Sequence, residues 1–313
     1  MFEKLLHKHV YSYLEHHKLL IPNNSGFWKK HSTLTSLLST CHSLYQAYDS
    51  NLSSRIVFLD KSKAFDRVDH ICLIFKLQQL GIDGSLLNLL SSCIFRRSQV
   101  VLLGRSRSDL KYTNCGVPQG SVLGPLSFFI YVNDIATNIK ASISLFADVT
   151  TLLHSDKCTV HLHSVLTQDL CTLHRWSELW NVTFNPQKTA VMTISKYRND
   201  HPPLLFNNTH LSETDRHKHL GSLFHHILSW HTHIVNLHHK VMTKINRLRS
   251  FGNLVPRHVL LTIYKTNILP VFDYGNIIYD NCCDYGNRML DKAQLSAAKI
   301  IVGCLKLHPL TMY

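Results

Sequence analysis

Two short apolar runs in this chain each end in an aspartate. The run I-V-F-L leads into Asp60, and L-F-A leads into Asp148 much further along. Such runs are typical of buried strands. If both strands share a sheet, the two carboxylates can hold a hard divalent ion, because Mg²⁺ needs only one or two carboxylates together with substrate phosphates. A lone aspartate at a strand end is ordinary, so spacing alone does not establish a metal site.

Apolar periodicity predicts the remaining elements. A Pro and two Gly exclude a helix interior at Gly116–Gly120. Residues 196–215 are polar and predicted to be loop-rich. From Ser229 onward the sequence pattern is helical and basic. A composition shift between 200 and 230 indicates a domain boundary there. The predicted helices span 1–20, 34–48, 72–80, 85–95, 126–135 and 167–180, and the predicted strands span 55–59, 99–103, 111–113, 143–146, 149–153 and 189–195.

Charge and cysteine content narrow the class of protein. Lys and Arg number 33 against 20 Asp and Glu, a formal charge of +13 that suits a polyanionic partner. The longest apolar stretch, 122–132, is broken by Gly and Pro and is too short to span a membrane, and the start lacks a secretory signal, so we expect no membrane partner. Nine cysteines without a C-x-x-C pair favour reduced intracellular thiols. No basic run distinguishes nucleus from cytoplasm.

Five sequence strings occur in a fixed order. They are F-L-D-K-S-K-A-F-D (58–66), G-V-P-Q-G-S-V-L-G-P-L (116–126), L-F-A-D (145–148), F-N-P-Q-K (184–188) and H-K-H-L-G (217–221). Together they closely resemble motifs A to E of the reverse transcriptases of non-LTR retrotransposons, the jockey-like and related LINE groups. N-N-S-G-F-W-K-K-H-S-T (23–33) resembles the fingers segment of that family, and 261–275 and 290–303 resemble the region located after the polymerase in such elements.

The resemblance implies an α+β, right-hand polymerase fold of fingers, palm and thumb with an antiparallel palm sheet. Residues 1–225 would form fingers and palm, and 226–313 a helical thumb-like segment. The implied activity is RNA-directed DNA polymerisation, with an RNA template, a DNA primer and deoxynucleoside triphosphates as partners. Asp60 and Asp148 would be the ligands of Mg²⁺, with Mn²⁺ as a possible substitute.

The resemblance also assigns roles to other side chains. Phe65 would be the steric gate against a ribose 2′-hydroxyl, although a Phe in an apolar run is more often a core residue. Gln119 and Gly120 would lie over the incoming nucleotide and template, unless they form a plain Pro-Gly turn. Lys188 would donate a proton to the leaving pyrophosphate or neutralise its charge; otherwise it is a solvated lysine.

A basic helical segment would contact the template–primer backbone, with affinity that falls as salt rises. A solvated helix face is the alternative for any one of its residues. These residues are Lys240, Lys244, Arg247 and Arg249.

Three positions depart from the family pattern. Val149 replaces the second aspartate of F-A-D-D, which removes a charge from the metal site. Trp28 stands where an Arg normally meets the triphosphate, and an indole cannot replace a guanidinium, although Lys29 or Lys30 offers a point charge. His219 stands where a tyrosine is expected. The substitutions are consistent with point-mutational drift in a decaying element copy.

Two alternatives to an active polymerase remain. One is a catalytically inactive remnant that at most binds RNA or DNA. The other is a zinc protein built on the 23 histidines, which include His225-His226, His231-x-His233 and His238-His239. These histidines lack the ordered four-ligand spacing of zinc sites, which disfavours the second alternative. The sequence leaves the oligomeric state open.

Overall fold

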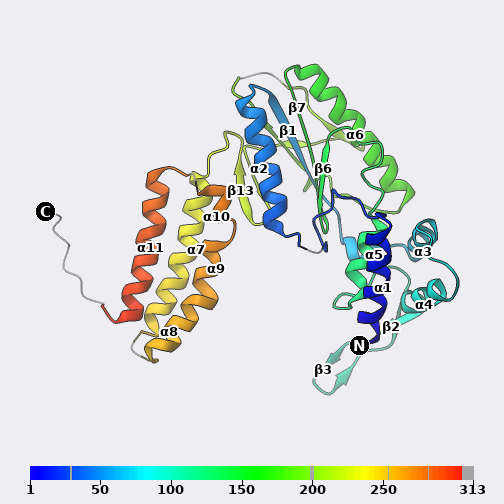
Figure 1. Ribbon diagram of the computed structural model, residues 1–313, viewed down its shortest axis with the longest axis horizontal. Helices are drawn as coiled ribbons and strands as arrows, with labels where there is room; N and C mark the ends of the chain where they lie inside the picture. The colour runs from blue at the N-terminus through cyan, green and yellow to red at the C-terminus, as the bar shows by residue number, and fades with distance from the viewer. Residues whose placement is uncertain (29, 198–200, 253, 281, 305–313) are drawn as a thin grey trace. The chain divides into compact units, whose positions relative to one another are not determined.

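The computed structural model describes residues 1–28, 30–197, 201–252, 254–280 and 282–304 (Figure 1). The chain folds into two compact units. Met1–Ser36 and Ala47–Thr214 form the first, and Leu37–Gln46 and Asp215–Tyr313 form the second. Both helices and strands build the first unit, and the second is mainly helical.

A five-stranded sheet forms the centre of the first unit, in the order β11-β8-β1-β7-β6. Neighbouring strands run antiparallel except β11, which pairs parallel with β8. The prediction of an antiparallel sheet is therefore wrong for this edge strand. Parallel pairing requires a long connection, and the chain has room for one because β8 ends at Ile194 and β11 begins at Ser212. The strands are β1 (Ser53–Asp60), β6 (Ser142–Phe146), β7 (Val149–Asp156), β8 (Ala190–Ile194) and β11 (Ser212–Glu213).

Helix α6 (Thr159–Leu179) packs on the sheet across β1 and β7 (Figure 1). Its leucines at 162, 166, 170 and 173 follow helical spacing and are buried in one core with Val57 and Leu152 of the strands. The other helical segments of the first unit are α1 (Phe2–His16), η1 (Ala64–Arg67), α3 (His70–Gln79), α4 (Gly84–Ile94) and α5 (Leu123–Tyr131), and α2 (Thr33–Asp49) contributes residues to both units.

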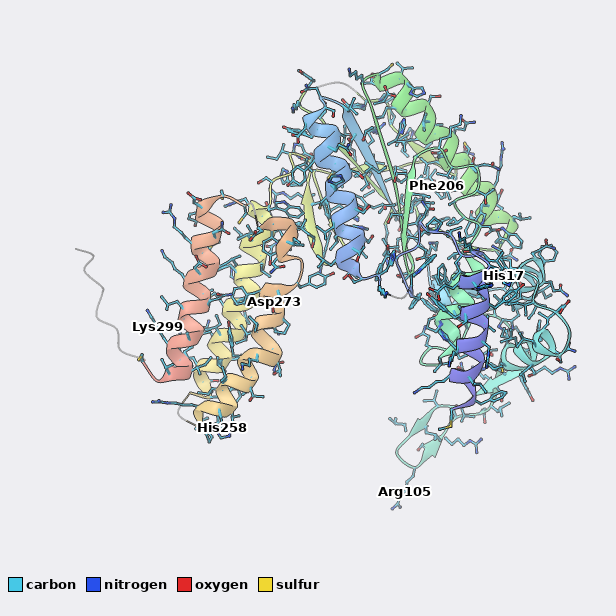
Figure 2. All side chains as sticks on the ribbon, viewed as in Figure 1. His17, Arg105, Phe206, His258, Asp273 and Lys299 are labelled. Atoms are coloured by element: carbon cyan, nitrogen blue, oxygen red, sulfur yellow. The ribbon has the colours of Figure 1, made fainter. Side chains whose placement is uncertain are left out.

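Short strand pairs lie outside the main sheet. A hairpin with Arg105 at its turn joins β3 (Leu102–Leu103) to β4 (Ser106–Arg107), and its side chains are exposed (Figure 2). It is carried by the pair of β2 (Arg97–Gln99) and β5 (Lys111–Thr113). A further hairpin joins β9 (Leu205–Phe206) to β10 (Thr209–His210).

The second unit contains one hairpin and a set of packed helices. The small residues Ala293 and Ala297 of α11 are buried with Val241 and Ile245 of α7, which allows the two helices to lie side by side (Figure 1). The elements are β12 (Arg216–His219), β13 (Ser222–His225), α7 (His231–Ser250), α8 (Arg257–Ile263), η2 (Tyr264–Ile268), α9 (Leu269–Asp273), α10 (Asn276–Tyr279) and α11 (Asp284–Val302).

The predicted helices and the strands that correspond to β1, β5, β6, β7 and β8 are confirmed, but several boundaries and some short strands differ from the prediction. Helix α5 begins at Leu123 rather than at 126, because Pro125 is tolerated in a first helical turn. Helix α6 begins eight residues before the predicted 167. The predicted strand 99–103 is divided between β2 and β3, and the loop-rich 196–215 contains three short strands. Within the described part of the chain, none of the helices combines the length and the apolar character needed to cross a membrane.

Candidate active site

A two-residue turn between β6 and β7 presents Asp148. Phe146 pairs with Val149, so Ala147 and Asp148 form the turn, and Ala147 has a φ of 53°. The segment preceding Trp28 runs beside this hairpin, with an amide–carbonyl bond in each direction between Leu145 and residues 23 and 25. A Cβ on Gly26 would lie 2.4 Å from the backbone N of Ala147. Gly26, which the sequence analysis did not single out, therefore permits the close approach.

Asp60 ends β1 at the edge where the β6–β7 turn lies. It is the cross-strand partner of Val149, the residue directly after Asp148. The two predicted metal ligands thus lie at the same end of adjacent antiparallel strands. Residues directly opposite in such a pair point to the same face, so a side chain at position 149 faces that of Asp60.

Lys61 has a buried amino group close to both carboxylates, and sequence reasoning did not select it. Its side chain is 2% exposed, and Nζ donates to Thr150 Oγ1 at 2.5 Å. Burial lowers the pKa of Lys61 to about 7, against the opposing charges of Asp148 and Asp60. The only signal in the sequence is its place immediately after Asp60, because its burial depends on the strands that cover it.

The F-N-P-Q-K segment is held against the end of β1 by backbone hydrogen bonds. Asn185 N–H donates to the Asp60 carbonyl at 2.9 Å, and Ser62 N–H donates to Thr183 at 2.9 Å. A turn after Asn185 then brings Lys188 Nζ to 3.7 Å from Asp60 Oδ2. The Lys188 side chain is 69% exposed, so its ammonium is accessible from solvent.

Phe65 lies in the short η1 helix, five residues after Asp60. Its half-buried ring stacks on Phe128 with centroids 4.5 Å apart, and it makes a T-shaped contact with the Phe27 ring, with centroids 5.9 Å apart. Its carbonyl accepts the N–H of Val117, which ties η1 to the Gly-Pro loop. The ring is therefore partly covered by Phe128 and Phe27 and partly exposed.

Gln119 and Gly120 are both exposed in that loop. Gln119 Nε2 donates to Asp66 Oδ1 at 2.8 Å, and the loop borders a polar cavity of about 590 Å³ that Arg97 also lines. Gly120 has a φ of 85°, and a Cβ there would meet nothing within 4 Å, so the space beside it is open to a ligand. The tight position is Gly116, where a Cβ would lie 2.8 Å from the Asp66 carbonyl oxygen.

Trp28 is half-buried rather than presented to solvent. Its indole packs on Phe129 with ring centroids 5.7 Å apart. Lys30 is exposed, in a left-handed conformation with φ 65°. Lys29 lies outside the described residues. Position 28, where the sequence resemblance predicts an Arg, thus holds a side chain that packs against the core and offers no guanidinium to an anion.

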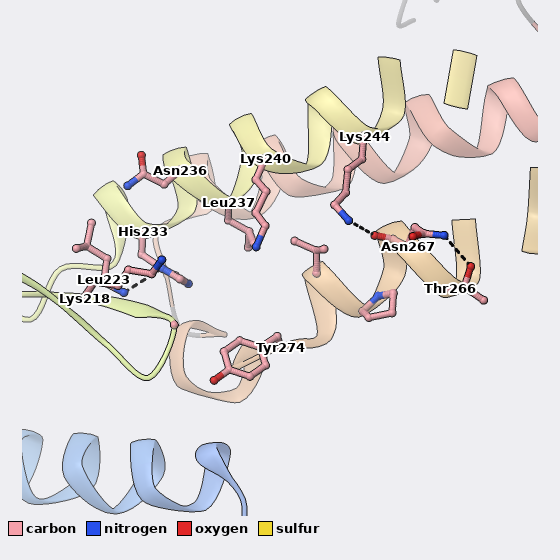
Figure 3. Close-up of a pocket in the computed structure, with 13 residues that line it drawn as sticks. Lys218, Leu223, His233, Asn236, Leu237, Lys240, Lys244, Thr266, Asn267 and Tyr274 are labelled. Atoms are coloured by element: carbon pink, nitrogen blue, oxygen red, sulfur yellow. Dashed lines mark hydrogen bonds between the residues drawn. The ribbon is translucent and has the colours of Figure 1, made fainter. Parts of the chain in front are cut away.

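The four predicted basic residues of α7 do not share one face. At about 100° per residue, Lys240, Lys244 and Arg247 lie within one stripe, and Arg249 points to the opposite side. Arg249 donates to Asn246 and Ser296 at 3.4 and 3.5 Å. Lys240 and Lys244 line a cavity of about 500 Å³ that also includes Lys218 and Tyr274 (Figure 3). Lys244 Nζ donates to the Asn267 carbonyl at 2.7 Å.

The order of these segments around Asp60 and Asp148 agrees with a comparison against known families. Residues 1–236 match the model of the reverse transcriptase (RNA-dependent DNA polymerase) family. The chain belongs to the reverse transcriptase family. Relatives with high coverage of this chain come from non-LTR mobile elements, as the sequence strings indicated.

Two curated relatives show the extent of the similarity. The probable RNA-directed DNA polymerase of transposon X-element of Drosophila melanogaster is 27% identical over 312 residues, covering 97% of this chain and 34% of the relative. The RNA-directed DNA polymerase of the mobile element jockey of Drosophila funebris is 29% identical over 290 residues, covering 89% and 32%. The chain thus spans about a third of the length of these relatives.

Among solved structures, apo telomerase from Candida tropicalis truncated from its C-terminal domain has a TM-score of 0.48. It is 10% identical, and the match covers 72% of this chain and 43% of the telomerase chain.

Proposed function

We propose that the chain is an RNA-directed DNA polymerase, adding deoxynucleotides to a DNA primer on an RNA template. The observation that carries the proposal is the pairing of Asp60 with Val149, which brings Asp60 to the turn that presents Asp148. We further propose the right-hand layout, with fingers and palm in residues 1–225 and a thumb in 226–313.

The residues around the two aspartates fit a divalent cation. Two carboxylates from neighbouring strand ends are the hard oxygen donors that Mg²⁺ prefers, and Mn²⁺ shares that preference. The Lys188 ammonium, 3.7 Å from Asp60 Oδ2, indicates that a cation is favoured there. When bound, Mg²⁺ supplies positive charge that aligns a primer 3′-hydroxyl with the α-phosphate of the nucleotide.

The surrounding side chains have separate roles in this proposal. Lys188 delivers a proton or positive charge to the departing pyrophosphate. Phe65 excludes a ribose 2′-hydroxyl, and the open space at Gly120, beside Gln119, admits the nucleotide and template. Lys30, two residues after Trp28, supplies an exposed point charge in place of the Arg that the family resemblance predicts at position 28. Lys29 has the same proposed role.

A catalytically inactive, nucleic-acid-binding protein is the second candidate function. Val149 favours it, since this apolar side chain occupies the position opposite Asp60 where the family has a carboxylate. The packing of Trp28 against Phe129 favours it as well, because the triphosphate loses its guanidinium. We expect the activity of the wild-type protein to be severely impaired rather than high.

Primer extension on a homopolymer RNA template tests the first candidate. The purified wild-type, Asp60→Ala and Val149→Asp proteins are compared in Mg²⁺ and in Mn²⁺. We expect weak extension by the wild type, none by Asp60→Ala, and an increase of about tenfold for Val149→Asp if the added ligand is worth about 1.4 kcal/mol in the transition state. Extension that survives Asp60→Ala would refute the polymerase proposal. Extension only after Val149→Asp would establish the second candidate.

RNA retention at increasing salt tests nucleic-acid binding separately. Replacing Lys240, Lys244 and Arg247 together with Ala should reduce the salt dependence of binding by up to roughly 0.7 in log–log slope per lost contact with single-stranded RNA. Arg249→Ala is the matched control on the opposite face of α7, and there we expect little change. An equal loss from Arg249→Ala would show that the stripe is not the binding surface.

A further inference from the structure

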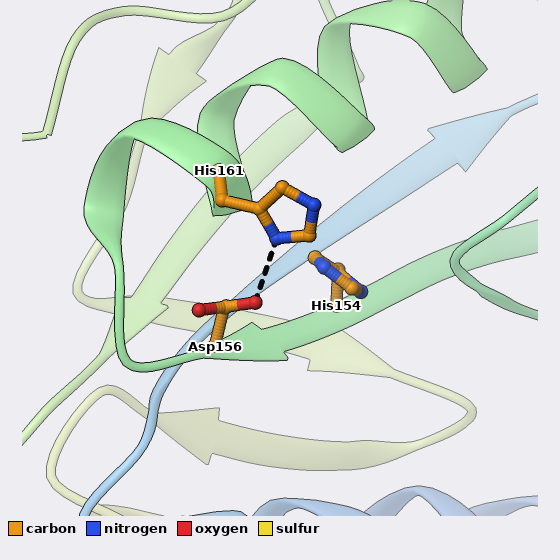
Figure 4. Close-up of side chains that lie close together, drawn as sticks. All are labelled: His154, Asp156 and His161. Carbon is orange, nitrogen blue, oxygen red and sulfur yellow. Dashed lines mark hydrogen bonds and ion pairs between the residues drawn. The ribbon is translucent and has the colours of Figure 1, made fainter.

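A second group of metal-ligating side chains lies at the opposite end of β7 from Asp148. His154 and Asp156 come from the strand and His161 from the first turn of α6 (Figure 4). One ligand atom from each residue lies within 4.8 Å of the other two. From Val149 to Asp156 the strand spans about 23 Å, so this group is separate from the candidate active site.

Local backbone geometry brings the three side chains together. Residues 154 and 156 alternate with 155 along the strand and therefore share a face. Side chains in a first helical turn lean back toward the helix N-terminus, which directs His161 toward the strand end. His161 Nδ1 lies 2.7 Å from Asp156 Oδ2.

A backbone contact fixes the carboxylate. Asp156 Oδ1 accepts the N–H of Cys158 at 2.7 Å, which leaves Oδ2 turned toward His161. Hydrogen bonds of this kind orient metal ligands and strengthen binding. The site therefore has an oriented carboxylate before any ion arrives.

The histidines complete a donor set. Nε2 of His154 is buried and has no hydrogen-bond partner within the described part of the chain, so it loses solvation without compensation. The His161 side chain is 61% exposed and the Asp156 side chain 27%, so solvent reaches the site.

The spacing suits a small ion after minor side-chain rotation. Ligands at 2.0–2.1 Å in tetrahedral geometry lie ~3.3 Å apart. The 2.7 Å distance between His161 Nδ1 and Asp156 Oδ2 would increase slightly. The other distances between ligand atoms, which are at most 4.8 Å, would shorten by side-chain rotation, for example of the exposed His161. Arg55 is the cross-strand partner of His154 in the β1–β7 pair. Its guanidinium donates to the Pro202 carbonyl at 2.9 Å.

We propose that His154, Asp156 and His161 bind a zinc ion, with water in the remaining position. Two imidazoles and one carboxylate are a zinc-type donor set, whereas Mg²⁺ prefers oxygen ligands alone. The ion ties the end of β7 to the start of α6.

The test is Zn²⁺ stoichiometry and affinity of the full chain, freed of metal by a chelator and kept reduced, in millimolar Mg²⁺. We expect His161→Ala and Asp156→Asn each to lower the affinity for one equivalent of Zn²⁺. The loss should be at least ~10–100-fold, which is the usual effect of removing a residue that only supports a metal ligand. The matched control is His231→Ala, an exposed histidine in the first turn of α7, which should retain it. Cys158→Ser should also retain it.

Co²⁺ provides a second readout, since its visible absorption reports nitrogen and oxygen ligands. We expect bands that disappear in His161→Ala while circular dichroism stays unchanged. Equal Zn²⁺ binding by wild type and His161→Ala would refute the site and indicate adventitious binding by other histidines. Displacement of the Zn²⁺ by millimolar Mg²⁺ would refute it as well. Neither result depends on polymerase activity.

Discussion

Replacing His219 with Leu should make the β12–β13 hairpin less sensitive to acid. His219 is 3% exposed, and its ring lies 6.0 Å from that of Phe224. Burial, followed by the nearby charge of His217, lowers the pKa of His219 from 6.5 to about 4. Between these two pKa values, His219 is therefore neutral in the folded state and protonated in the unfolded state.

The sign and size of the effect come from this difference in pKa. Between pH 6.5 and 4 the unfolded state binds more protons, so stability is fully present above pH 6.5 and is lost as the pH falls toward 4. Between pH 7 and 5 the loss is roughly 2 kcal/mol for this histidine. Leu has a similar volume and no titrating group, so the variant should not show that part of the loss.

Hydrogen exchange measured by mass spectrometry gives the free energy of opening for residues 216–225 at both pH values. The expected result is a wild-type protein that loses roughly 2 kcal/mol more than His219→Leu over this interval. His239→Leu, at an exposed histidine of α7, is the control and should behave like the wild type. Equal pH dependence of the wild type and His219→Leu would show that His219 is protonated in the folded protein without cost.

Three further variants test the first unit. Gly26→Ala should destabilise it by roughly 1–3 kcal/mol in urea unfolding, because its Cβ would lie 2.4 Å from Ala147 N; an unchanged midpoint would refute the close approach. Lys76→Met should lower the free energy of unfolding by roughly 1–3 kcal/mol, because it removes the contact of 2.5 Å between Lys76 Nζ and the Asp134 carboxylate. The loss stays in that range because the Asp134 carboxylate is partly exposed and can be rehydrated; a higher stability of the variant would contradict this. Phe65→Ala should raise kcat/KM for ribonucleotides relative to deoxynucleotides in primer extension, and an unchanged ratio would exclude the gate.

The sequence predicted the α-helices and the four longest strands of the first unit in their order, but not the short strands between residues 205 and 225. Apolar periodicity predicted β1, β6, β7 and β8, because buried strands and helix faces leave a local pattern of apolar residues. Helix ends were less accurate: the helix predicted over 126–135 is α5, which spans Leu123–Tyr131 and holds Pro125 in its first turn. The motif strings also predicted the family, which the match over residues 1–236 establishes.

Positions that depend on long-range packing were not predictable in the same way. Nothing near Lys61 in the sequence shows that it is buried beside Thr150, a residue from the paired strand. The same holds for Trp28, whose indole meets Phe129 in another helix. The position of Arg249 on the opposite face of α7 from Lys240 was predictable from helical geometry alone. Its contact with Ser296 was not, because it depends on how the helices pack.

The sequence by itself specified two apolar strands that lead to Asp60 and Asp148, and a basic helix, because backbone propensity and apolar spacing act over a few neighbouring residues. Only the tertiary structure decided that Asp60 is opposite Val149, that Lys188 reaches Asp60, and that His154 and His161 meet around Asp156. The physical reason is that strand pairing and helix docking join residues far apart in the chain, and their register is set by the burial of a whole face rather than by any local motif.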